Sequence, residues 1–181
     1  MQNIKYMFFV PIFHYKVNDW ENKKRNLLEY WNLTKNECIQ DENNLIHNFN
    51  LTPNNLKINY LIHQTFSEEI NNFTKDIEME CYEFIRGWFE STLKYSYHAP
   101  HNHGALGYSS VCFIEYDQNF HRPPTFFSPF NNFINGDSLL YTADDISEGS
   151  ILFFPSSILH CTDVNYSDVQ RLVVSFNLRL K

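Results

Sequence analysis

The chain has 181 residues, of which 43% are hydrophobic and 19% charged, a composition typical of one globular domain. Its formal net charge of −7 makes nucleic-acid binding unlikely, because that needs a basic surface. No apolar run is long enough to span a bilayer, and the four cysteines, none in a C-x-x-C pair, indicate reduced thiols. We therefore expect one domain over residues 1–181, located in the cytoplasm (the host cytoplasm if the chain is viral).

The first part of the chain is predicted to be mainly helical. After an aromatic strand over residues 5–17, an apolar stripe predicts a helix over 19–32. Residues 36–64 are asparagine-rich and only weakly patterned. A second stripe predicts one long helix on the outside of a sheet, because its members recur every three or four residues: Ile70, Phe73, Ile77, Cys81, Phe84 and Trp88.

The remainder of the chain is predicted to be β-structure. Candidate strands cover 93–98, 107–117, 138–142, 150–155, 158–164 and 170–180. Residues 117–136 form a long connection with five phenylalanines; it is either a lid at a binding site or an irregular strand with aromatics turned inward. The fold class is thus mainly β with flanking helices (α+β). The first half, 1–92, is expected to be helix-rich and 93–181 to form the core.

The last predicted strand has two different faces. Arg171, Ser175 and Asn177 share one face, and the alternate positions, including Leu172 and Phe176, share the other. An apolar face packs on a core, whereas a face with Arg, Ser and Asn meets either solvent or a polar cavity. The histidines upstream favour the cavity.

Two histidine clusters precede this strand. His101-Asn102-His103 places two imidazoles on one side of an extended segment, because side chains two apart in a strand point the same way. His160 follows about sixty residues later, after an apolar run. Three imidazoles can hold a metal ion and leave coordination positions open, and Arg171 supplies a fixed positive charge for an anion.

These residues resemble a known family. The ordered segments are His101–His103, Ser109–Ile114, Gly149–Ser156 leading to His160, and Arg171–Asn177. Together they are similar to small bacterial and phage-type members of the 2-oxoglutarate/Fe(II)-dependent oxygenase superfamily. Residues 98–178 carry the specific motifs.

The resemblance implies a double-stranded β-helix, a jelly-roll or cupin-like barrel supported by helices. It implies Fe(II) held by His101, His160 and His103, with no catalytic residue beyond the metal centre. It also implies 2-oxoglutarate as co-substrate on Arg171, with Ser175 adding a hydroxyl. Tyr97, on a predicted strand face just before the metal segment, is a candidate for lining that pocket. O2 would oxidise a C–H bond of a small-molecule or peptide substrate, and a homodimer is compatible with the sequence.

The chain departs from the superfamily pattern at two positions. The usual His-x-Asp or His-x-Glu here reads His-x-His, so His103 stands where a carboxylate ligand is expected. Val173 stands where many members have Ser or Thr, and Ser175 lies two residues further on. His98 is a weaker substitute ligand, and Glu115 or Asp117 in the next stretch is an alternative source of a carboxylate ligand.

Two other functions fit the same residues. One is a three-histidine cupin-type dioxygenase that uses no 2-oxoglutarate, for which the Pro155-to-His160 spacing is typical and Arg171 is incidental. The other is a non-catalytic barrel that serves as a binding module. The substrate is open in every case.

Overall fold

The structure is a computed structural model that describes residues 9–50 and 56–181. Its helices are α1 (Trp20–Thr34), the 3-10 turn η1 (Lys35–Glu37), α2 (Leu56–Thr65) and α3 (Ser67–Asp76). Its strands are β1 (Phe13–Lys16), β2 (Ile39–Gln40), β3 (Leu45–His47), β4 (Tyr82–Thr92), β5 (His98–His101), β6 (Tyr108–Glu115), β7 (Thr125–Asn131), β8 (Ser138–Thr142), β9 (Ser150–Pro155), β10 (His160–Thr162) and β11 (Arg171–Leu180).

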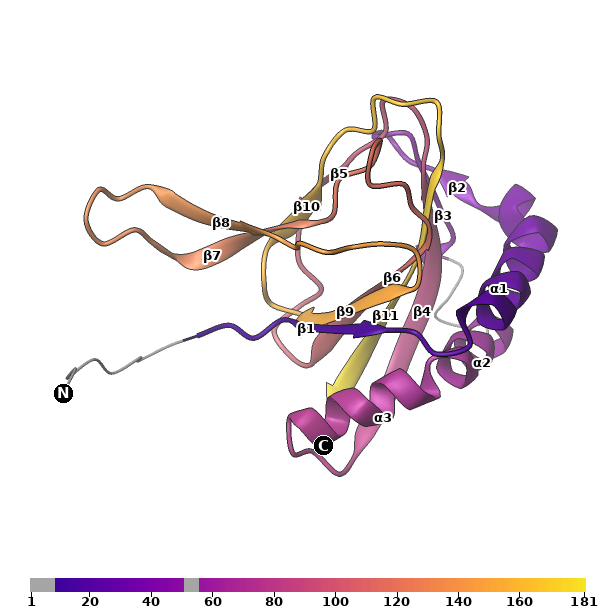
Figure 1. Ribbon diagram of the computed structural model, residues 1–181, viewed down its shortest axis with the longest axis horizontal. Coiled ribbons are helices and arrows are strands. Elements are labelled where there is room, and N and C mark those ends of the chain that lie inside the picture. The colour runs from indigo at the N-terminus through magenta and orange to yellow at the C-terminus, as the bar shows by residue number, and fades with distance from the viewer. Residues whose placement is uncertain (1–8, 51–55) are drawn as a thin grey trace.

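The strands form two antiparallel sheets (Figure 1). The larger sheet has the order β1-β9-β6-β11-β4-β3-β2, and the smaller has the order β5-β10-β7-β8. The three helices lie against the outer face of the larger sheet. This arrangement is the predicted mainly β fold with flanking helices. The first half also supplies β1 to β4 to the larger sheet, so the barrel draws on residues before 93 as well as after.

Alternation along the central strands creates two cores. Outward side chains such as Val174 and Phe176 pack with Phe66 and Phe73 from α3 and its start. The inward side chains of the larger sheet form a second cluster between the sheets, with Phe126 and Ile158 on the opposite side. The inward residues are Val111, Phe113, Leu152, Phe154 and Val173. Because β11 alternates as predicted, Arg171, Val173 and Ser175 all point between the sheets into one cavity.

The predicted long helix over Ile70–Trp88 is wrong in its second half. Helix α3 ends at Asp76, Glu78 has the left-handed φ of 55°, and β4 begins at Tyr82. A spacing of four residues fits one helix face and also one strand face, so the stripe could not separate the two structures. Gly87 lies inside β4, where a Cβ would come within 2.6 Å of Ile62 Cδ1; the missing side chain lets α2 approach the sheet.

Three further boundaries differ from the expectation. The strand expected over 5–17 is only Phe13–Lys16, although residues 5–8 lie outside the described range. The strand expected over 93–98 is instead a turn, because Tyr95 has the left-handed φ of 66°, and β5 starts at His98. Within 117–136 the chain forms β7, which sequence reading left open between a lid and a strand. In the described part of the chain, no helix has the length and apolar character needed to cross a membrane.

Candidate metal centre

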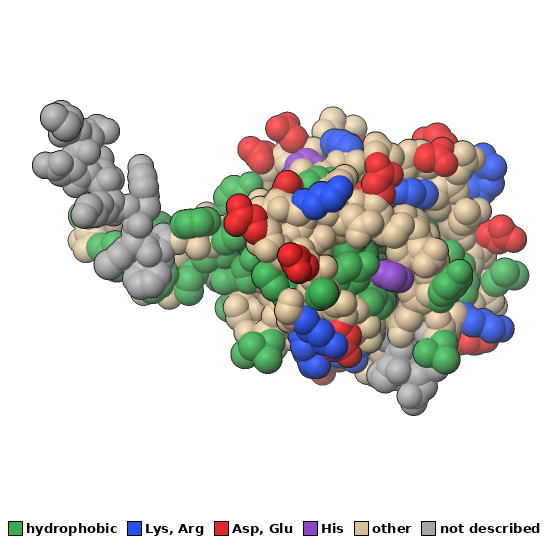
Figure 2. All heavy atoms as spheres, turned by 90° about the horizontal axis from the view of Figure 1, so that it is seen from below, with side chains coloured by type: hydrophobic (Ala, Val, Ile, Leu, Met, Phe, Trp, Pro, Cys, Tyr) green, Lys and Arg blue, Asp and Glu red, His purple; other side chains and the backbone are tan. Residues whose placement is uncertain are grey.

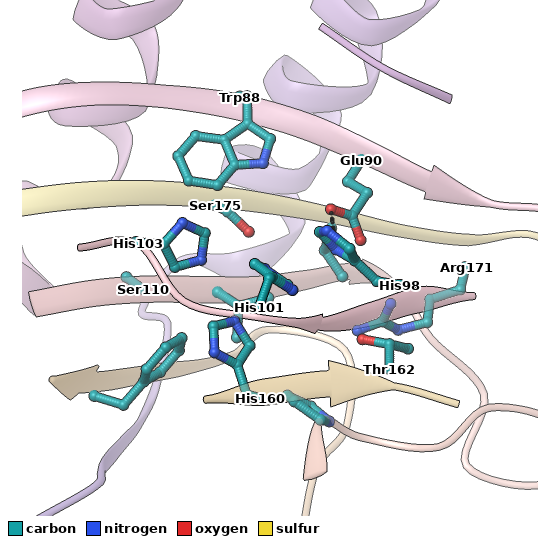
Figure 3. A pocket seen from close by; sticks show the side chains of 14 residues that line it. Trp88, Glu90, His98, His101, His103, Ser110, His160, Thr162, Arg171 and Ser175 are labelled. Carbon is teal, nitrogen blue, oxygen red and sulfur yellow. Dashed lines mark ion pairs between the residues drawn. The ribbon is translucent and has the colours of Figure 1, made fainter. Parts of the chain in front are cut away.

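Three imidazoles meet between the two sheets (Figure 3). His101 ends β5 and His160 begins β10, and the two are direct partners across these antiparallel strands. His103 follows β5 by two residues, and its backbone N–H donates to Ser156 O at 2.8 Å. One ring nitrogen from each histidine lies within 4.8 Å of the others, close enough for a shared ion. The strand pairing therefore brings together residues almost sixty positions apart.

Backbone hydrogen bonds orient two of these rings. His101 Nδ1 lies 2.8 Å from Ala99 O, and His160 Nδ1 lies 2.9 Å from Ile158 O. A carbonyl only accepts, so each Nδ1 carries the proton and donates it, and each Nε2 keeps a free lone pair. This arrangement is typical of metal-ligating histidines, whose second nitrogen is fixed by a partner. The donor set therefore fits a divalent transition metal.

The three imidazoles favour the neutral form. Burial, followed by the neighbouring His160 and His101, lowers the pKa of His103 to about 3. Burial and His101 lower the pKa of His160 to about 4, and burial followed by His98 lowers the pKa of His101. Neutral imidazole is the form that binds a metal, so near pH 7 the cluster needs no deprotonation before it takes an ion.

Arg171 is a buried cation at the other end of the same cavity. It is 3% exposed, and its Nη1 donates to Thr92 Oγ1 at 3.4 Å, while Nε has no hydrogen-bond partner. Among residues 9–50 and 56–181 it forms no ion pair. Burial lowers the pKa of its guanidinium. A buried cation without a paired anion is costly, so this end of the cavity suits an anionic ligand.

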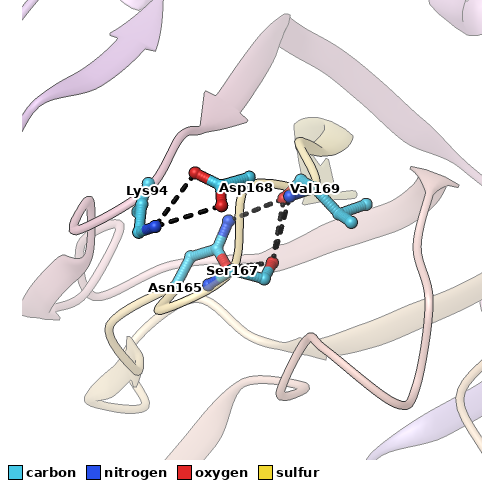
Figure 4. Close-up of polar contacts among 5 residues, drawn as sticks. All are labelled: Lys94, Asn165, Ser167, Asp168 and Val169. Carbon is cyan, nitrogen blue, oxygen red and sulfur yellow. Dashed lines mark hydrogen bonds and ion pairs between the residues drawn. The ribbon is translucent and has the colours of Figure 1, made fainter.

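Hydrogen bonds and an ion pair fix the loop before β11 (Figure 4). Buried Asn165 donates from Nδ2 to Val169 O at 2.8 Å and to Thr92 O at 3.3 Å. Its Oδ1 accepts from the backbone N–H of Ser167 at 3.0 Å. At the surface, Lys94 Nζ lies 3.0 Å from Asp168 Oδ1. These bonds join the loop to the end of β4, where Thr92 contacts the guanidinium.

Sequence reading missed a carboxylate beside the cluster. Glu90 on β4 is buried, and its Oε2 lies 3.0 Å from Nδ1 of His98 on β5, whose ring stacks on His101 with centroids 3.7 Å apart. Burial alone would raise the pKa of Glu90, but the charge and hydrogen bond of His98 outweigh it and lower the pKa to about 2. Glu90 is engaged by His98; its charge raises the pKa of Arg171 against the larger effect of burial, but the two side chains form no ion pair. The predicted helix over Ile70–Trp88 replaced most of β4, so the strand face that Glu90 occupies was not recognised.

Two spaces open on the imidazoles. The cavity that joins them to Arg171 has a volume of about 30 Å³, which holds an ion and about two waters. A second groove of about 280 Å³ shares His101 and His103 and continues past Trp88 toward Asp41 and His47. The inner cavity is thus tight, and the outer groove has the size of a small ligand site.

The other predicted site residues occupy varied positions. Ser175 lines the inner cavity, but it lies four residues along β11 from Arg171, roughly 13 Å away. Tyr97 is 38% exposed and precedes β5. Glu115 Oε2 accepts a hydrogen bond from Gln170, and Asp117 Oδ1 accepts one from Asn119 N–H, so neither side chain belongs to the imidazole cluster.

Comparisons of the sequence with known proteins find no match. No protein-family model matches the chain, and no curated protein matches its sequence.

Comparisons of structure are informative. The epimerase SnoN from nogalamycin biosynthesis, solved with Fe3+, alpha ketoglutarate and nogalamycin RO, matches with a TM-score of 0.72 at 13% identity, over 93% of this chain and 78% of SnoN. The collagen prolyl hydroxylase of Paramecium Bursaria Chlorella virus-1, solved as a 2OG complex, matches with a TM-score of 0.60 at 9% identity, over 93% of this chain and 95% of that one. A prolyl-4-hydroxylase from Pseudomonas putida matches with a TM-score of 0.61 at 10% identity, over 93% and 92% of the two chains. The chain therefore has the double-stranded β-helix fold of 2-oxoglutarate/Fe(II)-dependent oxygenases, as its sequence motifs predicted.

Proposed function

We propose that this protein is a non-haem Fe(II)- and 2-oxoglutarate-dependent oxygenase that oxidises, by hydroxylation in the simplest case, a C–H bond of a small-molecule or peptide substrate. One observation carries the proposal: a single cavity holds three neutral imidazoles at one end and a buried, unpaired guanidinium at the other. A dicarboxylate that reaches Arg171 offsets the cost of burying its charge. The fold supports the same class.

In this proposal the three histidines hold Fe(II) and Arg171 takes the far carboxylate of 2-oxoglutarate. When bound with O2, Fe(II) and 2-oxoglutarate would supply the oxidising power, with succinate and CO2 as products. The backbone bonds of His101 and His160 fix the rings so that each Nε2 would be free to bind the ion. We keep Ser175 and Tyr97 as proposed contacts of the co-substrate. Ser175 lies toward the His103 end of the cavity, and Tyr97 is partly exposed.

The groove of about 280 Å³ is the proposed substrate site. It opens directly on His101 and His103, so a substrate held there lies beside the metal. Its walls combine Phe49 and Trp88, whose rings meet edge to face at 5.0 Å, with polar Asn102 and Asp41. We place the reaction in the cytoplasm, because all four cysteines are free thiols.

A three-histidine dioxygenase that uses no 2-oxoglutarate is the second candidate. The observation that favours it is the 30 Å³ volume of the inner cavity, which 2-oxoglutarate can enter only if lining side chains move. In that case Arg171 binds an anionic substrate or has no ligand.

Anaerobic titration with Fe(II) and 2-oxoglutarate separates the two candidates. We expect a visible charge-transfer band that needs both components. Arg171→Met should raise the 2-oxoglutarate concentration required about 10- to 100-fold, because it removes a buried charge-assisted bond, and leave Fe(II) affinity unchanged. Arg179→Met, at an exposed position of the same strand, is the matched control.

The third ligand is tested in the same assay. His103→Ala should weaken Fe(II) binding, whereas His103→Asp should preserve it, because aspartate restores the usual two-histidine, one-carboxylate set. If the wild-type protein with Fe(II) gives the same absorption band with and without 2-oxoglutarate, the main proposal is ruled out and the second candidate is favoured.

A further inference from the structure

The β7–β8 hairpin projects from the body of the molecule (Figure 1). Between Arg122 and Asp144 its sequence contains a single charged residue, Asp137. At its tip, Phe133 and Ile134 are 93% and 97% exposed. In Figure 2 the projecting arm shows hydrophobic side chains, whereas the acidic and basic side chains visible in that view lie over the body. Large exposed apolar surfaces of this kind mark sites of interaction.

Strand β8 is also an open edge. Among the residues that the structure describes, it pairs with β7 alone in the smaller sheet, and all five of its residues are exposed. Its sequence, Ser138-Leu139-Leu140-Tyr141-Thr142, has no charge and no proline. Natural edge strands normally carry Lys, Pro or a bulge that prevents pairing with another chain. The irregularity in the hairpin, between Phe127 and Asn131, lies in β7 on the inner side of β8. The outer edge of β8 itself carries no Lys or Pro, which favours strand addition there.

We propose that this protein forms a two-fold homodimer in which β8 of one copy pairs antiparallel with β8 of a second copy, centred on Leu140. In this register Leu140 faces its own equivalent, Leu139 faces Tyr141, and Ser138 faces Thr142. Apolar residues then oppose apolar residues and hydroxyls oppose hydroxyls, so the strand is complementary to itself. Such a contact closes after two copies, as an isologous interface must.

An apolar groove along the hairpin is the proposed binding site for the exposed tip of the second copy. The groove has a volume of about 410 Å³ and runs along the hairpin to its base. It is lined on one side by β7 and β8 and on the other by Phe9, Val10, Ile12 and Ile158. Antiparallel pairing places the tip of each hairpin beside the base of the other. Phe133 and Ile134 of one copy therefore meet the groove of the second copy.

Charge and area favour a second copy as the occupant. Two chains of net charge −7 repel each other over most of their surfaces, so they associate best through a surface that lacks charge. Taking roughly 200 Å² for a fully exposed large side chain, the apolar side chains of this surface present about 1,000 Å², comparable to the area that each partner buries in a stable interface. They are Phe9, Val10, Phe130, Phe133, Ile134, Leu139, Leu140 and Tyr141.

The interface would lie next to the metal centre. Phe126 lines the groove, and its ring lies 5.8 Å from that of His160 and 5.0 Å from that of Phe154. The tip of the second copy is therefore separated from a proposed metal ligand by one aromatic ring. The dimer covers this side of the smaller sheet and leaves the groove at Asp41 and His47 on another side of His101.

Sedimentation velocity of the full-length chain tests the proposal. We expect a dimer whose dissociation constant rises about a hundredfold in Leu140→Lys, because the substitution places two like charges opposite each other at the dyad. Leu33→Lys, at an exposed position of α1, is the matched control and should leave the dimer intact. A monomer at about 100 μM overturns the proposal, as does a dimer indifferent to Leu140→Lys.

Disulfide trapping tests the register. In a Cys81→Ser background, which removes the exposed thiol, Leu140→Cys should cross-link to itself on oxidation, because paired residues have Cα atoms about 4.5–5.5 Å apart. Ser138→Cys should cross-link only when mixed with Thr142→Cys. Failure of Leu140→Cys to cross-link in a dimer, or a monomer that binds anionic lipid vesicles or an extended peptide instead, overturns this arrangement.

Discussion

The two sheets of this protein differ in what they contribute. The larger sheet contains strands of up to 11 residues, and its outer face is covered by three helices. The smaller sheet has strands of three to seven residues and an open edge at β8. Yet His101 and His160 come from the smaller sheet, whereas Arg171 and Glu90 come from the larger. The proposed metal ligands and the helix-covered core therefore come from different sheets, and the proposed anion end of the cavity lies in the larger one.

The largest expected effect is on the metal ligands of the smaller sheet. His160→Ala should weaken Fe(II) binding more than about 100-fold, because even residues that merely orient a ligand cost 10–100-fold. The free energy of unfolding should fall by only about 1 kcal/mol, the value of one hydrogen bond. Calorimetric metal titration and urea unfolding measure the two quantities, with exposed His14→Ala as control. Global unfolding of His160→Ala would contradict the division between the sheets.

The complementary change removes a core side chain from the larger sheet. Phe176 is fully buried and its ring lies 5.8 Å from that of Phe66 and 5.5 Å from that of Phe84. Phe176→Ala should lower the free energy of unfolding by about 3–5 kcal/mol, because it leaves a cavity. Fe(II) affinity of the folded fraction should be unchanged. The same substitution at exposed Phe133 should have almost no effect on the unfolding of the monomer, and equal losses at both sites would refute this account.

The smallest effect concerns the ion pair that bridges the two sheets. The pKa of Glu90, about 2, lies below its ordinary 4.5, so its stabilising contribution is present above pH 4.5 and is lost as pH falls through about 2. Burial alone would lower the pKa of His98, but Glu90 raises it above 6.5, so the contribution of His98 is present below pH 6.5 and lost as pH rises through the folded pKa. The pair therefore stabilises most between pH 4.5 and 6.5.

Glu90→Gln should remove that pH dependence in the metal-free protein. We expect a loss of about 1–2 kcal/mol at pH 5.5 and a smaller loss at pH 2 and pH 8, measured by urea unfolding. Glu83 lies on β4 as Glu90 does, and it forms a surface ion pair with Lys181. Glu83→Gln should therefore lower the free energy of unfolding far less than Glu90→Gln. Parallel losses at all three pH values would show that Glu90 contributes through packing alone.

Sequence patterns predicted the end of the chain far better than its middle. The alternation of β11 was clear because one of its faces meets an apolar core and the other a polar cavity. The role of Glu90 was missed because Phe84 and Trp88 are four residues apart, a spacing that suits both a helix and a strand. Strand β4, which carries Glu90, was therefore taken for a helix. The role of β7 was undecided because its phenylalanines divide between the core, as Phe126 does, and an exposed hairpin, as Phe130 does. These choices depend on partners distant in the chain.

The carbonyls of Ala99 and Ile158 have one further consequence. Each imidazole is oriented by the residue two places earlier in the chain, Ala99 within β5 and Ile158 in the turn before β10, so the backbone sets the ring directions whether or not an ion is bound. If the three histidines hold iron as proposed, metal binding then follows folding rather than driving it, and removal of the ion leaves the site preformed.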